Sequence, residues 1–78
     1  MANARAARAR IARNFVDRYG AERLRELLDL LSAGESGQVI ATSFDVSRER
    51  VRQWKNAFGT VVTLYQVHPE VQSVLDEA

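Results

Sequence analysis

The chain contains no cysteine, one histidine, one proline and no long run of apolar residues. The absence of cysteine excludes disulfide bonds and thiolate chemistry, and it suits a reducing compartment. The single histidine, His68, has no second histidine or cysteine with which to form a typical metal site. No apolar stretch approaches the length of a membrane span. An apolar core must therefore stabilise the protein by itself.

The chain is short, with 78 residues, but 46% of them are apolar. This is enough for a single domain over residues 1–78 with a modest core, and it argues against a disordered tail. A domain of this size without disulfides or metal is marginally stable. We therefore expect a homodimer, in which each subunit buries additional surface.

The net charge is only +1, but the charges are unevenly distributed. The first 20 residues contain five arginines and one acid, whereas the last ten contain three acids and no lysine or arginine. We expect faces of opposite sign, with the basic one suited to phosphate. The Ala- and Arg-rich start also resembles an organelle transit peptide, but it lacks serine and leads directly into a helical pattern. We therefore expect it to be part of the fold.

Apolar residues recur at helical spacing in five segments, separated mainly by glycines and serines. The predicted helices cover residues 4–18 (within a basic segment, 1–19), 21–33, 37–44, 48–57 and 69–77. Residues 60–67 are rich in β-branched side chains, but a lone strand has no partner, so we predict a short helix there. The predicted fold class is all-α, a small domain of about five helices with a helix-turn-helix at residues 36–58.

The same spacing predicts which apolar side chains face the core. In the first helix they are Ala4, Ala7, Ile11, Phe15 and Tyr19, and in the second they are Leu24, Leu27, Leu28 and Leu31. Leu30 lies off the second stripe and hints at a further contact surface. In the last helix the stripe is Val71, Val74 and Leu75.

The most informative stretch is residues 37–54, where two short helices are expected to cross at a steep angle. Ser36 and Ser47 are each placed to cap one of these helices. Ala41 is the small residue that a close crossing needs, and Asp45 occupies the turn, where a positive φ is expected. The apolar residues between the helices are Ile40, Phe44, Val46, Val51 and Trp54.

This stretch resembles the helix-turn-helix of bacterial and phage transcription regulators. Within it, Phe44–Gln53 reads FDVSRERVRQ and is similar to the promoter-recognition helix-turn-helix in region 4 of primary sigma factors. Trp54 follows this decapeptide, and tryptophan is common at that position in repressor-type proteins. The resemblance implies a DNA-binding domain whose second helix, residues 47–57, enters the major groove.

Helical geometry divides that second helix into two faces. If Val51, Trp54 and Phe58 point inward, the outward residues are arginine, glutamine, asparagine and glutamate, all of which can contact base edges. The predicted base contacts are Arg48, Glu49, Arg52, Gln53 and Asn56. The predicted phosphate contacts are Gln38, Ser47, Arg50 and Lys55, with Arg5 and Arg8 of the basic segment. Solubilising charge is an equally good explanation for the N-terminal arginines.

We expect a sequence-specific transcriptional regulator of bacterial, plasmid or phage type that binds double-stranded DNA as a homodimer. It would act without a cofactor or metal, in the cytoplasm with the nucleoid. One alternative is a protein-interaction module that binds RNA polymerase or another regulator. A second is an architectural or partition protein that binds DNA with little sequence preference. An enzyme is not expected, because there is no Gly-rich phosphate loop and no recognisable nucleophile with its base.

Overall fold

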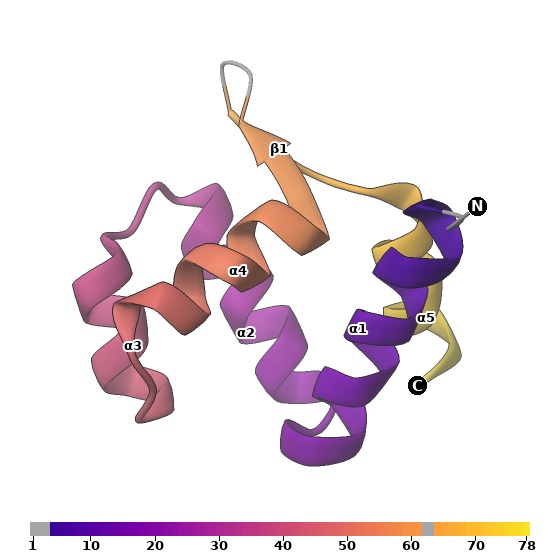
Figure 1. Ribbon diagram of the computed structural model, residues 1–78, viewed down its shortest axis with the longest axis horizontal. Helices are drawn as coiled ribbons and strands as arrows, with labels where there is room; N and C mark the ends of the chain where they lie inside the picture. The colour runs from indigo at the N-terminus through magenta and orange to yellow at the C-terminus, as the bar shows by residue number, and fades with distance from the viewer. Residues whose placement is uncertain (1–3, 62–63) are drawn as a thin grey trace.

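The computed structural model describes residues 4–61 and 64–78. Within these residues it contains five helices and two short strands (Figure 1). In chain order they are α1 (Ala4–Tyr19), α2 (Ala21–Ser32), α3 (Gly37–Phe44), α4 (Arg48–Phe58), β1 (Gly59–Val61), β2 (Tyr65–Val67) and α5 (Pro69–Glu77). The predicted all-α class is confirmed. Each of the five predicted helices is present, and no bound differs from the prediction by more than one residue.

Gly20 separates α1 from α2, as its position in the sequence predicts. Its φ of 95° belongs to a region that residues with a Cβ atom rarely adopt. The backbone N–H of Gly20 donates to the carbonyl oxygen of Val16 at 2.8 Å, which closes the last turn of α1. The chain can therefore reverse direction within a single residue, and α2 packs back against α1.

Aromatic rings in the core join α1 to α3 and α4. The ring centroid of Phe15 in α1 lies 5.0 Å from that of Trp54 in α4, with the rings inclined by 80°. The Phe44 ring in α3 lies 5.8 Å from Trp54. Such edge-to-face pairs are favoured because the positive edge of one ring meets the negative face of the other. The predicted apolar stripe of α2 is buried in the same core: Leu24, Leu27, Leu28 and Leu31.

The apolar stripe predicted for α1 is wrong in its first half. Ala12 is fully buried, whereas Ile11 is 37% exposed and Ala4 is exposed. The reason is that α1 packs against α2, α4 and α5, so three neighbouring helices determine its buried side. Leu30 in α2 is partly buried against the core, and the further contact surface at this residue stays a prediction.

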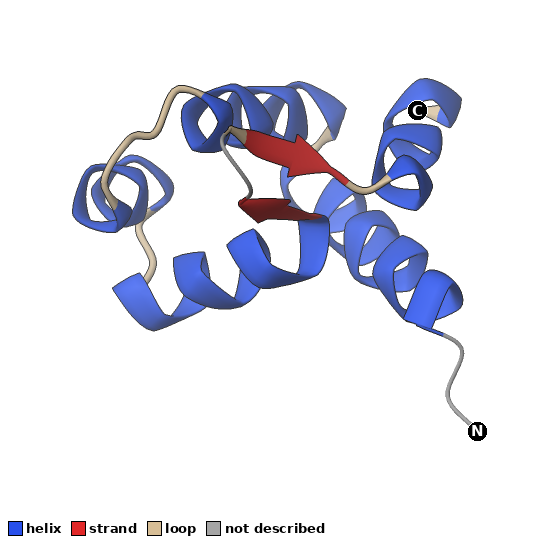
Figure 2. Cartoon of the chain, turned by 90° about the horizontal axis from the view of Figure 1, so that it is seen from above, coloured by secondary structure: helices blue, strands red, loops and turns tan. Residues whose placement is uncertain are grey.

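Residues 60–67 do not form the predicted helix. β1 and β2 pair in antiparallel register, with Gly59 opposite Val67 and Val61 opposite Tyr65 (Figure 2). The prediction failed because the two ends of this segment pair with each other, so neither strand needs a partner from elsewhere. β-branched residues favour such extended pairing. The part of the prediction that concerns residues 62–63 lies outside the described residues.

The hairpin is attached to the end of α4 through the side chain of Tyr65. The Tyr65 hydroxyl donates to the carbonyl oxygen of Lys55 at 2.7 Å, and this satisfies one of the last carbonyls of α4. Burial raises the pKa of this hydroxyl. A Cβ atom at Gly59 would lie 2.6 Å from Cζ of Tyr65, so only glycine leaves room for the ring.

α5 packs along α1 and brings the acidic end of the chain onto the basic start (Figure 1). Nε of Arg5 lies 3.1 Å from Oε1 of Glu70, and a guanidinium nitrogen of Arg13 lies 3.8 Å from Glu77. The predicted separation into faces of opposite sign is therefore wrong for these two segments, because folding places them side by side. The predicted apolar stripe of α5 is buried: Val71, Val74 and Leu75.

Candidate functional site

The turn between α3 and α4 has the predicted conformation. Asp45 adopts a φ of 55° and a ψ of 49°, in the left-handed region. The backbone N–H of Val46 donates to the carbonyl oxygen of Ala41 at 3.0 Å, so the chain turns immediately after α3. Ala41 is buried, and its small side chain suits the close packing of α3 on α4.

Both helices begin at the predicted serine caps. Oγ of Ser36 accepts a hydrogen bond from the N–H of Val39 at 3.2 Å, and Oγ of Ser47 accepts one from the N–H of Arg50 at 3.1 Å. These bonds satisfy N–H groups that have no partner within the first helical turn. The Ser47 hydroxyl, a predicted phosphate contact, accepts in its cap and still has its own proton to donate.

α4 has one buried side and one exposed polar side. Val51, Trp54 and Phe58 are buried, as predicted from their spacing. Figure 2 shows α4 along an outer side of the molecule, leading into β1. All five predicted base contacts are exposed: Arg48, Glu49, Arg52, Gln53 and Asn56. The structure therefore brings these five side chains together on one solvent-facing helix.

Arg52 and Glu49 form a two-pronged ion pair on that exposed side. Nε of Arg52 donates to Oε2 of Glu49 at 3.0 Å, and a terminal guanidinium nitrogen donates to Oε1 at 2.7 Å. These hydrogen bonds lower the pKa of the Glu49 carboxyl and raise the pKa of Arg52. Because both side chains are more than half exposed, the pair orders the side chains more than it stabilises the fold.

Basic side chains border the polar side of α4 at both edges. Arg50 lies at the edge that faces α1, where it lines a pocket together with Arg18. Lys55 and Arg48 lie at the other edge, where they line a depression with Gly37 at the start of α3. The polar side thus carries cations at both borders, and between them it carries the Arg52–Glu49 ion pair and the amides of Gln53 and Asn56.

The remaining predicted phosphate contacts lie in two other places. Gln38 is exposed in the first turn of α3, where Nε2 donates to Oγ1 of Thr42 at 3.2 Å. Arg5 and Arg8 lie against α5, and a guanidinium nitrogen of Arg8 is 3.7 Å from Oε1 of Glu70. The pKa of Glu70 is lowered, first by its own backbone N–H and then by these two cations. Phosphate contact by Arg5 and Arg8 stays a prediction.

Arg23 of α2 contacts the end of α3, and the sequence pattern did not identify this residue. One guanidinium nitrogen donates to the carbonyl oxygen of Ser43 at 2.9 Å, at the end of α3. Another donates to Glu26 at 2.6 Å. The spacing of Arg23 and Glu26 along one helix is readable from sequence. The contact with Ser43, 20 residues away, has no such signal.

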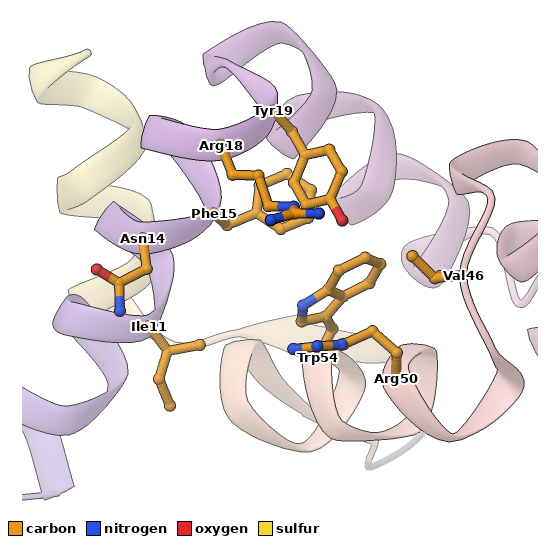
Figure 3. Close-up of a pocket in the computed structure, with 8 residues that line it drawn as sticks. All are labelled: Ile11, Asn14, Phe15, Arg18, Tyr19, Val46, Arg50 and Trp54. Carbon is orange, nitrogen blue, oxygen red and sulfur yellow. The ribbon is translucent and has the colours of Figure 1, made fainter.

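The pocket between α1 and α4 has a volume of about 380 Å³ and lies beside the polar side of α4 (Figure 3). Phe15, Tyr19 and Trp54 form its aromatic lining. Arg18 extends from the α1 side and Arg50 from the α4 side. The pocket therefore combines apolar ring surface with two cationic groups at its border.

In residues 4–61 and 64–78, no helix has both the length and the apolar character needed to cross a bilayer. The same residues contain no group of three or more His, Cys, Asp or Glu side chains that could hold a metal ion. Comparison of the chain with protein-family models, with curated proteins and with solved structures gives no match.

Proposed function

We propose that the chain is a sequence-specific transcriptional regulator that binds double-stranded DNA by inserting α4 into the major groove. The observation that carries the proposal is the division of α4 into a side buried through Trp54 and an exposed side rich in arginine and amide groups. A major groove about 12 Å wide admits one helix with its side chains. The left-handed turn at Asp45 and the resemblance to helix-turn-helix regulators support the same function.

Within this proposal, Arg52, Gln53 and Asn56 are the principal base contacts. Their chemistry suits direct readout, since arginine pairs with guanine and an amide pairs with adenine. Glu49 holds the Arg52 guanidinium in one orientation before DNA arrives, so less side-chain entropy is lost on binding. A guanidinium has five N–H donors, and the Glu49 pair leaves some of them for a base.

The proposed complex is a homodimer on a two-fold-related site. A single α4 offers contacts to only a few base pairs, and a net charge of +1 gives little long-range attraction to DNA. Two copies would place their α4 helices on half-sites about one helical turn of DNA apart. Dimerisation would thereby increase both the affinity and the length of the recognised sequence.

Selection from random DNA duplexes, followed by gel shift and mass measurement of the complex, tests the proposal. We expect enrichment of duplexes that contain one half-site sequence twice, in the two-fold-related arrangement proposed above. The Arg52→Ala variant should lose about 1–3 kcal/mol of binding free energy and relax discrimination at one base pair. The control is Arg25→Ala, since Arg25 is exposed on α2 and lines a pocket with Leu28 and Gln72, away from α4.

Other outcomes would contradict specific readout by α4. A uniform loss of affinity on all sequences would make Arg52 a phosphate contact. Binding without any sequence enrichment, but with a steep dependence on salt, would indicate an architectural protein. Capture of RNA polymerase that is unchanged in the Arg52→Ala and Gln53→Ala variants, together with absence of DNA binding at low salt, would indicate a protein-interaction module.

A further inference from the structure

We infer that the pocket between α1 and α4, an open groove, binds one sugar–phosphate strand of the bound DNA. Arg18 and Asn14 of α1 hold this strand together with Arg50 of α4. The inference rests on the proposed function. It gives α1 a DNA contact near its C-terminal end, at a different place from Arg5 and Arg8.

The first support is the direction of the α1 side chains. Ile11, Asn14 and Arg18 are spaced by three and four residues, so they share one side of the helix. All three line the groove that faces α4 (Figure 3). The guanidinium carbon of Arg18 lies 5.5 Å from the centroid of the Tyr19 ring. Contact with this ring positions the Arg18 charge at the border of the groove.

The second support is that folding pairs three of the five arginines of α1 with acidic side chains of α5. Arg5, Arg8 and Arg13 each lie within 4.0 Å of a carboxylate of α5. Within the described residues, no carboxylate lies within 4.0 Å of the Arg18 or Arg50 guanidinium. The charge of the first three is thus partly balanced inside the protein. The charge of Arg18 and Arg50 remains available to an external anion, next to α4.

The third support is the chemical match between the groove and a DNA strand. A sugar–phosphate strand presents anionic oxygens and apolar deoxyribose carbons. The groove presents two guanidinium groups and the Asn14 amide, together with apolar surface of Ile11 and Tyr19 that is only partly buried. Arginine and asparagine are both common donors to phosphate oxygens.

The position of the groove also agrees with the geometry of a helix in the major groove. A strand of the duplex runs along each edge of the DNA major groove, so each edge of α4 faces one strand. The protein groove between α1 and α4 lies at the Arg50 edge of α4, while Lys55 lies at the opposite edge. Arg18 and Asn14 would therefore extend the contact with one strand beyond what α4 itself reaches.

The test measures the affinity of the full chain for a mixed-sequence duplex over a range of salt concentrations, with circular dichroism to check folding. We expect Arg18→Ala to weaken binding about tenfold near 0.1 M salt. The slope of log K against log salt should decrease by about 1. Arg18→Lys should retain most of that slope, and the control Arg25→Ala should bind as the wild type does.

A second pair of variants tests the groove without removing an arginine. Ile11 is partly exposed at the same border. Ile11→Glu should weaken DNA binding more than Ile11→Gln, because only the first introduces a carboxylate facing phosphate. This comparison decides the question if Arg18→Ala proves unfolded by circular dichroism.

The outcomes separate this inference from the proposed function. Suppose the wild-type protein binds DNA, but Arg18→Ala has the same affinity as Arg25→Ala, or Ile11→Glu has the same affinity as Ile11→Gln. Either result would overturn the inference while leaving α4 as the DNA-reading helix. A folded wild-type protein that binds no duplex even at low salt would overturn both.

Discussion

The guanidinium carbon of Arg23 lies 3.8 Å from the centroid of the Phe44 ring, so α2 covers the end of α3 with a cation–π contact. The same side chain donates to the carbonyl oxygen of Ser43. One residue of α2 therefore holds the last turn of α3 just before the left-handed turn at Asp45. The orientation of α4 depends on this support, because α4 begins directly after the turn.

Removal of the Arg23 side chain should destabilise the fold. A cation–π contact and one charge-assisted hydrogen bond together predict that Arg23→Ala lowers the free energy of unfolding by about 1–3 kcal/mol. Urea denaturation measures this change. Arg25→Ala, on the exposed side of the same helix, should stay within about 0.5 kcal/mol of wild type. Equal stability of the two variants would show that the Arg23 contact contributes nothing.

Substitutions at Asp45 should rank by their tolerance of positive φ. Asp45→Gly should be neutral or slightly stabilising, because glycine adopts this conformation without steric cost. Asp45→Val should lose about 1–2 kcal/mol or more, since a β-branched residue is strained there. Thermal melts of the three proteins measure the order. A valine variant as stable as the glycine variant would exclude the left-handed turn.

Gly59→Ala should lower the stability of the fold more than the same substitution at Gly37, at the start of α3. The new Cβ would collide with Tyr65 and with the carbonyl oxygen of Gln66, which predicts a loss of about 1–3 kcal/mol. Gly37→Ala is the matched control, because nothing lies within 4 Å of a Cβ there. Alanine also favours the helix. If chemical denaturation gave equal stabilities for the two variants, the contact between Gly59 and Tyr65 would not hold.

Trp54→Ala should leave the protein largely unfolded. The side chain is only 6% exposed and contacts several other rings, so truncation should cost about 3–5 kcal/mol. That is comparable with the whole stability of a small domain. Circular dichroism against temperature measures the loss. Gln53→Ala, one residue earlier and exposed, should melt near the wild-type temperature. Retained stability of Trp54→Ala would mean that the buried side of α4 is misassigned.

The ion pair between Glu49 and Arg52 on α4 should make the stability of the fold depend on pH. The pKa of the Glu49 carboxyl should lie below its usual range, since Arg52 hydrogen bonds to its charged form. A folded-state pKa that is lowered in this way adds stability above the unfolded-state pKa. That stability is lost as the pH falls through the folded-state pKa. A carboxyl-carbon NMR titration measures the value. Arg52→Gln should raise the pKa of Glu49, whereas Arg48→Gln should leave it in place.

Much of the fold follows from local sequence. The bounds of the helices could be predicted because each depends on neighbouring residues: Ser36 and Ser47 cap through bonds to N–H groups three residues on, and Gly20 supplies a positive φ. The two sides of α4 likewise follow from the position of Val51 and Trp54 in the helical repeat. Short-range hydrogen bonds and periodicity are properties of the sequence itself.

Only the tertiary structure decided which segments meet. The burial of Ala12 in place of Ile11, the pairing of β1 with β2, and the seating of Arg23 on Phe44 all depend on residues brought together by the chain's path in space. The same applies to Arg5 and Arg18, which belong to one basic helix but face α5 and α4 respectively. Charge and hydropathy along a sequence give the character of each side chain, whereas packing against several neighbours at once selects its partner.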